Sequence, residues 1–347
     1  MELAHEDKTG RQAFYEKLDG VNTAPLWAVM SQLVTPEPRS RCVPHKWGYA
    51  GMRALLMEAG GLITAKEAER RVLVLENPGI RGLSQVTQSL YAGLQLILPG
   101  EVAPSHRHAA AALRLIIEGG GYTAVNGERI PMAPGDFIVT PSWMFHDHGN
   151  LTDDPVIWLD GLDVPIINLF DASFAESYPG GDVQQVDRPA GDAHARYGAN
   201  MVPLEYEPDS MSSPIFHYPY ARVREALLQI ESAGMRDASH GFKLQYANPV
   251  TGGYPMPTMA AYMQLLPAGF CGQPYRSTDA TVYCVREGEG TTFVGNERIE
   301  WSVGDVFVTP SWSTTSHQVG ERSVLFSFSD RAAQKALGVW REERLND

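Results

Sequence analysis

Short apolar runs rich in β-branched residues alternate with turn residues along most of the chain. Typical runs cover 94–98, 136–140 and 306–309, and each is bounded by Gly, Pro or Asp. This alternation is typical of antiparallel β-structure with many turns. Segments rich in helix formers are few, and they predict helices at 53–58, 65–71, 222–232 and 331–337.

The sequence contains two copies of one β-rich segment. At an offset of 169 residues, 21 of 54 positions are identical between 95–148 and 264–317, without a gap. The longest match places the Thr-Pro-Ser-Trp run at 140–143 on the same run at 309–312. A repeat of this length predicts two copies of one β-barrel in tandem.

The repeat divides the chain into five parts, and the fold class we predict is mainly β. We expect an N-terminal helical arm at 1–84, a first barrel at 85–170, a connector with a helix at 171–255, a second barrel at 256–330 and a C-terminal helical tail at 331–347.

Composition and charge exclude several classes of protein. The chain has 347 residues, of which 44% are hydrophobic and 20% charged, so it is long enough for two domains with real cores. The net charge of −13 repels phosphate backbones and anionic membrane surfaces, so we expect no nucleic-acid or membrane partner. The charged start and the lack of a long apolar stretch predict a soluble, cytoplasmic protein. Three cysteines without a C-x-x-C pair favour neither a disulfide framework nor a thiolate metal site.

Two histidine pairs lie in the first copy, His106-Arg-His108 and His146-Asp-His148. Side chains at i and i+2 of a strand share a face, so two such strands can present imidazoles to one ion. At the repeat offset, His106, His108 and His146 become Tyr275, Ser277 and Thr315. Because the second copy keeps the turn residues but loses all three histidines, the histidines are not needed for the fold. We therefore predict a metal at His106, His108 and His146, with iron, zinc, copper or nickel as candidates.

The first copy resembles the cupin superfamily. Gly100, His106, His108 and Gly119 match its first motif, G-x5-H-x-H-x3,4-E-x6-G, and Gly135, Pro141, His146 and Asn150 match its second, with Trp143 in place of the middle Gly. The motif's Glu falls at Ala112 or Leu113, so the site has three histidines and no acid. The resemblance implies a bicupin, with two tandem cupin barrels.

The whole chain is similar to the gentisate 1,2-dioxygenase family, which includes salicylate and 1-hydroxy-2-naphthoate dioxygenases. The resemblance is carried by the segments at 44–49, 69–75, 91–95, 106–108 and 158–165. It implies one Fe(II) per chain, held by three histidines of the N-terminal cupin, with no metal in the second. It also implies a homo-oligomer, often a tetramer.

Three imidazoles on an octahedral ion leave three positions open. The carboxylate and phenolate oxygens of an ortho-hydroxybenzoate can fill two of these, and the third remains for O₂. For gentisate, the resemblance implies cleavage between the carboxyl-bearing carbon and the adjacent hydroxyl-bearing carbon, giving maleylpyruvate. Salicylate and 1-hydroxy-2-naphthoate remain alternative substrates.

Six further residues are candidates for substrate contact or catalysis. Arg114, an even number of residues after His108, is expected on the inward face, and a guanidinium fits a carboxylate; the alternative is a surface Arg. The resemblance gives His148 a hydrogen bond to substrate or oxygen species and places Gln95 on the substrate side. Tyr91, also a candidate for substrate contact, stands where some relatives carry Trp, so the identity of the ring substrate stays open. Gln95 and His148 recur as Gln264 and His317, so a structural role stays open. For Asp160 two roles are open: it orients a histidine, or it is itself a plain turn residue. Arg70 either reaches the mouth of the site or lies on a helix surface.

Two other classes of cupin are rivals. A zinc or manganese isomerase or lyase usually retains the motif Glu, which this chain lacks. A storage-type bicupin has no need of a histidine triad in one barrel alone.

Overall fold

The computed structural model describes residues 8–199, 201–206 and 210–345. The chain divides into two units, Met1–Arg39 and Ser40–Asp347. The smaller unit contains helices α1 (Lys8–Asp19) and α2 (Leu26–Leu33), and its Trp27 indole donates a hydrogen bond to the Tyr15 hydroxyl over 3.0 Å. No helix in the described part of the chain is long and apolar enough to cross a membrane.

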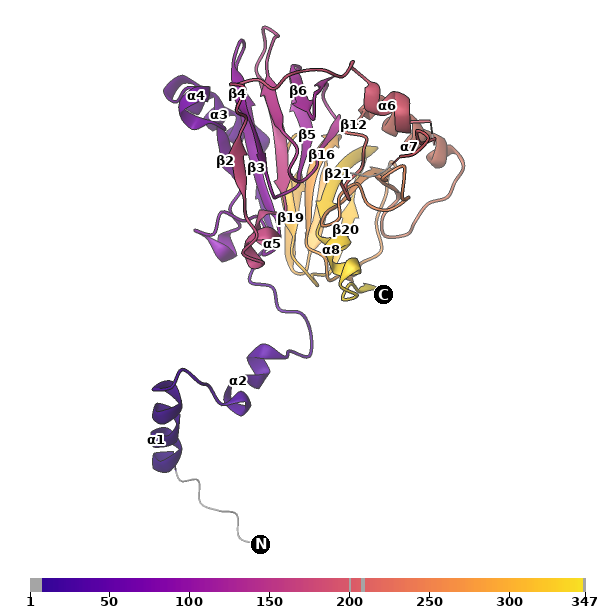
Figure 1. The fold of residues 1–347 in the computed structure, drawn as a ribbon. Coiled ribbons are helices and arrows are strands. Elements are labelled where there is room, and N and C mark those ends of the chain that lie inside the picture. Colours follow the sequence, from indigo (N-terminus) through magenta and orange to yellow (C-terminus); the bar gives the residue numbers. More distant parts are fainter. Residues whose placement is uncertain (1–7, 200, 207–209, 346–347) are drawn as a thin grey trace. The chain divides into compact units, whose positions relative to one another are not determined.

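The first barrel consists of two antiparallel sheets (Figure 1). Its six-stranded sheet has the order β12 (His217–Tyr218), β8 (Phe137–Thr140), β5 (Ala112–Glu118), β10 (Val156–Leu162), β3 (Tyr91–Ile97) and β2 (Val72–Val74). Its five-stranded sheet has the order β11 (Ala175–Ser177), β4 (Val102–His108), β9 (His146–Gly149), β6 (Tyr122–Val125) and β7 (Glu128–Pro131).

The second barrel repeats this arrangement. Its six-stranded sheet has the order β1 (His45–Trp47), β19 (Val306–Thr309), β16 (Thr281–Glu287), β21 (Ser323–Ser329), β14 (Ala260–Leu266) and β13 (Phe242–Gln245). Its five-stranded sheet has the order β18 (Glu297–Trp301), β17 (Gly290–Val294), β20 (Thr315–Gln318), β15 (Tyr275–Ser277) and β22 (Glu342–Arg344). The mainly β fold with two barrels is therefore confirmed.

Helices connect and flank the sheets. They are α3 (Tyr49–Leu62), α4 (Ala65–Ala68), the 3₁₀ turn η1 (Pro78–Ile80), α5 (Val164–Leu169), α6 (Asp192–Tyr197), α7 (Tyr220–Ser232) and α8 (Arg331–Ala336). The helix predicted at 65–71 is too long, because Glu69 adopts a positive φ of 53° and ends α4 after one turn. The other three predicted helices overlap α3, α7 and α8.

The two six-stranded sheets share one hydrophobic core. Leu94 and Leu113 of the first barrel belong to the same buried cluster as Val282 and Phe326 of the second. Alternate residues of the same strands face the inside of their own barrel, as Arg114 does in the first. These strands are buried on both faces, which explains why their sequences read as nearly continuous apolar runs.

Each barrel is completed by a strand that precedes the other barrel in the chain. Strand β1, which comes before the first barrel, pairs with β19 of the second, and β12 from the connector pairs with β8 of the first. A helix follows each of these strands. The first residue of each helix donates its backbone N–H to a carboxylate of the barrel that the preceding strand joins. Tyr49 donates to Asp305 over 2.8 Å, and Tyr220 donates to Asp136 over 2.9 Å.

The same tyrosine rings cover equivalent glycines. Gly304 and Gly135 have φ of 85° and 92°, and a Cβ at either would lie 2.6 Å from the ring of Tyr49 or Tyr220. Tyr49 and Tyr220 are 171 residues apart, two more than the offset between the barrels, so a comparison without gaps does not detect this part of the repeat. The domain boundaries stay a prediction. In the structure, residues 40–84 supply one strand to each barrel.

Candidate metal centre

Three histidines of the first barrel converge on one point. His106 and His108 lie on β4, His146 lies opposite His106 on the paired strand β9, and one ring nitrogen from each lies within 4.8 Å of the others. The ring centroids are 4.6 to 5.2 Å apart. The described residues contain no second group of three such side chains. The convergence predicted from the two H-x-H pairs is therefore present.

The hydrogen bonds of two of these rings determine their tautomers. His108 Nδ1 lies 2.7 Å from the carbonyl oxygen of Ala110, and His146 Nδ1 lies 3.0 Å from that of Met144. Because a carbonyl oxygen only accepts, each Nδ1 carries the proton, and each Nε2 keeps a lone pair for a metal. His146 Nε2 is buried and has no hydrogen-bond partner in the part of the chain that the structure describes.

Electrostatics keep all three imidazoles neutral. Burial lowers the pKa of His106 to about 2, with a further contribution from the Arg70 guanidinium, and lowers that of His108 to about 4. The pKa of His146 is also well below its ordinary value, first because of burial and then because of His108. Neutral imidazole is the form that binds metals, so the three residues fit a cation such as iron or zinc.

The Thr-Pro-Ser-Trp turn at 140–143 supports the strand that carries His108. Trp143 has φ of 63° and donates its backbone N–H to the His108 carbonyl over 2.9 Å. In the second barrel Trp312 has φ of 62° and donates to Ser277, the counterpart of His108, over 2.7 Å. The longest match of the repeat is therefore scaffold, and it serves both barrels.

A cavity of about 370 Å³ opens onto the three histidines. Eight of the nine residues that the sequence singled out line it, namely Arg70, Tyr91, Gln95, His106, His108, Arg114, His146 and Asp160. His148 is not among the lining residues. The cavity therefore brings together a metal triad, two guanidinium groups and a phenol.

Arg114 and Asp160 form a buried ion pair beside the triad. Arg114 Nε lies 3.1 Å from Asp160 Oδ1 without a hydrogen bond between these two atoms, and Arg114 Nη1 donates to Thr140 Oγ1 over 2.6 Å. Burial lowers the pKa of Arg114, and the carboxylate opposes this shift. Arg114 is 3% exposed, so it is not a surface residue, and Asp160 lies within β10 and not in a turn.

Arg70 and Gln95 add polar groups to the cavity. Arg70 Nη2 donates to the Pro104 carbonyl over 2.7 Å, and its pKa is lowered to about 10 by burial and by Arg114. The Gln95 amide nitrogen is buried without a hydrogen-bond partner among the described residues. Arg71, by contrast, is bound to Glu101 over 2.6 Å, away from the cavity lining, and is structural.

His148 lies next to His146 of the triad but is not part of the cavity lining. Its Nδ1 is hydrogen-bonded to Thr123 Oγ1. The Thr123 hydroxyl also donates a hydrogen bond to the Asp147 carbonyl over 3.2 Å. The hydroxyl proton of Thr123 is thus directed to Asp147, so His148 Nδ1 donates and Nε2 keeps its lone pair. The His148 and His146 rings are 5.7 Å apart, and His317 repeats the arrangement with Thr292 in the second barrel.

Sequence reasoning missed the rest of the cavity wall. Leu83, Ser84 and Gln85 belong to a loop, and Val164, Pro165 and Asn168 belong to α5. Val164 and Pro165 fall in the 158–165 run, which indicates only a family resemblance, and the positive φ of 55° at Ser84 appears only in the structure. Nothing in the local pattern assigns these residues to the site, because they lie outside the repeated segment 95–148.

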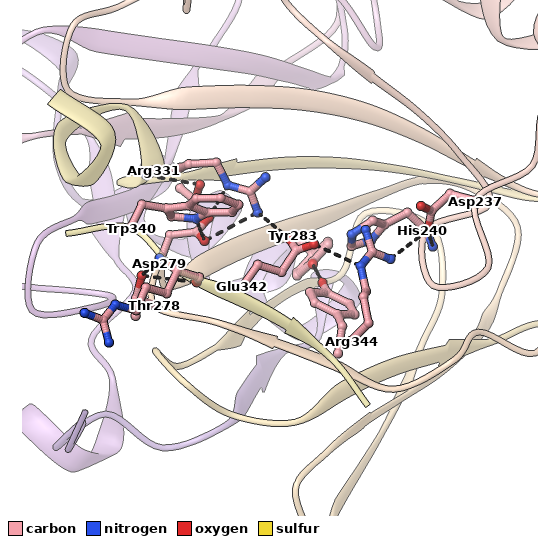
Figure 2. A network of polar contacts seen from close by, with 12 residues as sticks. Asp237, His240, Thr278, Asp279, Tyr283, Arg331, Trp340, Glu342 and Arg344 are labelled. Atoms are coloured by element: carbon pink, nitrogen blue, oxygen red, sulfur yellow. Dashed lines mark hydrogen bonds and ion pairs between the residues drawn. The ribbon is translucent and has the colours of Figure 1, made fainter. Parts of the chain in front are cut away.

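Tyrosines occupy the equivalent part of the second barrel. Tyr275 and Tyr283, which stand in place of His106 and Arg114, share a hydrogen bond of 3.0 Å between their hydroxyls. Tyr283 also stacks on Phe307 with centroids 4.8 Å apart. Figure 2 shows Tyr283 beside a network of paired charges that includes Arg344, Glu342 and Arg331. In the second barrel, packed aromatic rings therefore occupy the region that is equivalent to the histidine triad of the first barrel.

Comparison with known proteins agrees with this description. Residues 93–163 match the Cupin domain family. The chain is 56% identical over 335 residues to gentisate 1,2 dioxygenase 1 of Aquipseudomonas alcaligenes, covering 96% of each chain, and 35% identical to a gentisate 1,2-dioxygenase of a Streptomyces species, covering 95% of this chain and 94% of that one.

Among solved structures, the salicylate 1,2-dioxygenase of Pseudoaminobacter salicylatoxidans, in an adduct with gentisate, superposes with a TM-score of 0.93 at 32% identity. The match covers 99% of this chain and 96% of that one. These relatives are dioxygenases, so neither an isomerase or lyase nor a storage protein is favoured. With a histidine triad in one cupin barrel and near full-length similarity to these enzymes, the chain belongs to the gentisate 1,2-dioxygenase family.

Proposed function

We propose that this protein is a ring-cleaving dioxygenase that converts gentisate and O₂ to maleylpyruvate, with one Fe(II) per chain at His106, His108 and His146. The observation that carries the proposal is a neutral histidine triad at a cavity that also contains a buried guanidinium. The similarity of the whole chain to gentisate 1,2-dioxygenases supports gentisate as the substrate. Both oxygen atoms of O₂ enter the product.

When bound, Fe(II) would supply a Lewis acid for the carboxylate and phenolate oxygens of the substrate and a redox centre for chemistry with O₂. Three neutral imidazoles leave the positive charge of the ion undiminished, which favours an anionic ligand. The Nδ1–H groups of His108 and His146 hold their rings in place through backbone carbonyls. The protein thereby fixes the direction of each lone pair before the substrate arrives.

Arg114 and Arg70 recognise the substrate carboxylate. Both line the cavity, and their mutual repulsion lowers the pKa of Arg70, so an anion placed between them is stabilised by both charges. Asp160 orients Arg114 from the neighbouring strand. Gln95 offers a buried amide N–H to the substrate, and Tyr91 presents its phenol to the ring.

His148 offers its Nε2 lone pair as a hydrogen-bond acceptor during the reaction. Its ring is fixed by Thr123, and its Nε2 is buried and has no partner in the described residues. The substitution His148→Gln retains a polar side chain but removes the ring nitrogen that carries this lone pair. We expect His148→Gln to bind iron and substrate normally and to lose kcat, and a loss of iron instead would assign His148 to the support of the triad.

An oxygen-electrode assay with gentisate, salicylate and 1-hydroxy-2-naphthoate tests the substrate. We expect the highest kcat/KM for gentisate and the appearance of maleylpyruvate in parallel with oxygen uptake. Failure of all three to consume oxygen with an iron-loaded protein would reject the proposal. A preference for salicylate or the naphthoate would keep the reaction class and change the substrate.

We also propose a cytoplasmic homo-oligomer, a tetramer by analogy with the family. The N-terminal unit exposes Trp27, Met30, Leu33 and Val34, and apolar side chains of this kind commonly mark protein interfaces. All three cysteines are free, as suits a reducing compartment. Light scattering coupled to size-exclusion chromatography measures the mass directly.

A further inference from the structure

A chain of hydrogen bonds leads from a triad histidine into the second barrel. His108 Nδ1 donates to the carbonyl of Ala110 over 2.7 Å, and the N–H of Ala111 donates to Asp163 Oδ1 over 2.8 Å. The carbonyl of Ala110 and the N–H of Ala111 are the two ends of one peptide group. The second carboxylate oxygen, Asp163 Oδ2, accepts from Thr258 Oγ1 over 2.5 Å.

The middle of this chain is buried, whereas His108 and Thr258 at its two ends are half-buried. Asp163 is 2% exposed, and Ala110 and Ala111 are 6% and 2% exposed. A buried polar group that loses its partner is not compensated by solvent, so these bonds hold the peptide group in one orientation. Asp163 also directly precedes α5, whose Val164 and Asn168 line the cavity.

The second barrel contains the same arrangement without the histidine. Asp330 Oδ1 accepts from the N–H of Ala280 over 3.1 Å, and Asp330 Oδ2 accepts from Ser89 Oγ of the first barrel over 2.7 Å. Ser277 stands there in place of His108. Each barrel thus holds the carboxylate of the other, but only the carboxylate of the first barrel is connected to a triad residue.

We propose that Asp163 and Thr258 are positioning residues for His108, so that the second barrel orients a metal ligand of the first. This inference rests on the proposed metal centre. By fixing the Ala110–Ala111 peptide, the pair fixes the acceptor of the His108 Nδ1–H, and with it the direction of the Nε2 lone pair. The second barrel then contributes to the geometry of the metal centre as well as to packing.

The matched substitutions Asp163→Ala and Asp330→Ala test this role. Both remove a buried carboxylate that links the two barrels, so both should lower the Tm of the metal-free protein. Affinity for Co(II), read from its visible absorption, should fall in Asp163→Ala, by no more than the roughly 10- to 100-fold that follows loss of a direct partner of a metal ligand, and stay unchanged in Asp330→Ala. Unchanged affinity in Asp163→Ala, or an equal loss in both variants, would overturn the inference.

A milder pair of variants covers the case in which Asp163→Ala does not fold. Thr258→Ala removes the hydroxyl that holds Asp163, whereas Thr258→Ser keeps it. We expect weaker Co(II) binding in Thr258→Ala and wild-type binding in Thr258→Ser; identical affinities would reject the role of Thr258. If the wild-type protein itself binds no Co(II), the metal centre is wrong and the inference fails with it. Normal wild-type binding with unaffected variants removes only the inference.

Discussion

Arg114 and Asp160 face each other across β5 and β10 as direct register partners, with Nε and Oδ1 3.1 Å apart. The pair is buried at the wall of the cavity that contains the histidine triad. A buried charge pair costs desolvation, and this one places a guanidinium at the wall of the cavity onto which the triad opens. Under the proposed function, we expect this guanidinium to recognise an anionic substrate.

Replacing Arg114 by alanine should weaken catalysis and spare the iron. The guanidinium should contribute a charge-assisted hydrogen bond of roughly 1.5–3 kcal/mol to the bound carboxylate, so kcat/KM should fall by about tenfold to a few hundredfold or more. Steady-state kinetics and iron analysis measure both quantities. Tyr283→Phe at the equivalent position of the second barrel is the control. Wild-type efficiency in Arg114→Ala would remove Arg114 from substrate recognition.

Purified protein should contain about one iron per chain. His106→Ala and His146→Ala should each lose the iron together with activity, because two imidazoles hold the ion far more weakly than three. Elemental analysis and oxygen uptake test this prediction. Two metals per chain, or a metal retained by both variants, would contradict a single site at the triad.

Changes at the second barrel should leave turnover per bound iron intact. Tyr275→Phe removes the 3.0 Å hydroxyl contact with Tyr283 and should cost about 1 kcal/mol of unfolding free energy. Ser277→Ala should be equally harmless to catalysis. Denaturant unfolding and kcat normalised to iron content measure these effects, and a thousandfold loss of kcat at normal iron content would reveal a second or shared active site.

Asp279 should stabilise the second barrel in a pH-dependent manner. Burial raises the pKa of its carboxyl, but Arg331 at 3.1 Å and the hydrogen bonds from Ser329 and Trp340 together outweigh burial, so the folded pKa lies below 3.8. The folded state therefore holds this proton more weakly than the unfolded chain. The stabilisation is complete above about pH 3.8 and is lost as the pH falls through the folded pKa.

Accordingly, Asp279→Asn should lower the free energy of unfolding by about 3–5 kcal/mol at pH 7, since it breaks a buried pair. Its difference from the wild type should shrink below pH 3.8. Urea unfolding at pH 7 and pH 3.5 measures both values. Glu300→Gln breaks the exposed pair with Arg298 and should cost less than about 1 kcal/mol. A difference that grows on acidification would contradict this assignment.

The repeated barrels and the convergence of three histidines in the first barrel could be predicted from the amino-acid sequence alone. Both follow from local rules: side chains alternate along a strand, and the repeat shows which histidines one barrel lacks. For the same reason Arg114 was expected to face inward, and it lines the cavity.

The way the two barrels interlock and the residues that close the cavity became visible only in the three-dimensional structure. Strands β1 and β12 are three and two residues long, which is too short for their sequences to specify a partner strand. Strand β1 pairs with the second barrel, and β12 pairs with the first. The Arg114–Asp160 pair depends on the register between β5 and β10, and the Asp163–Thr258 bond spans 95 residues. Such contacts are set by the packing of whole sheets, because no periodicity in the sequence records which strands become neighbours.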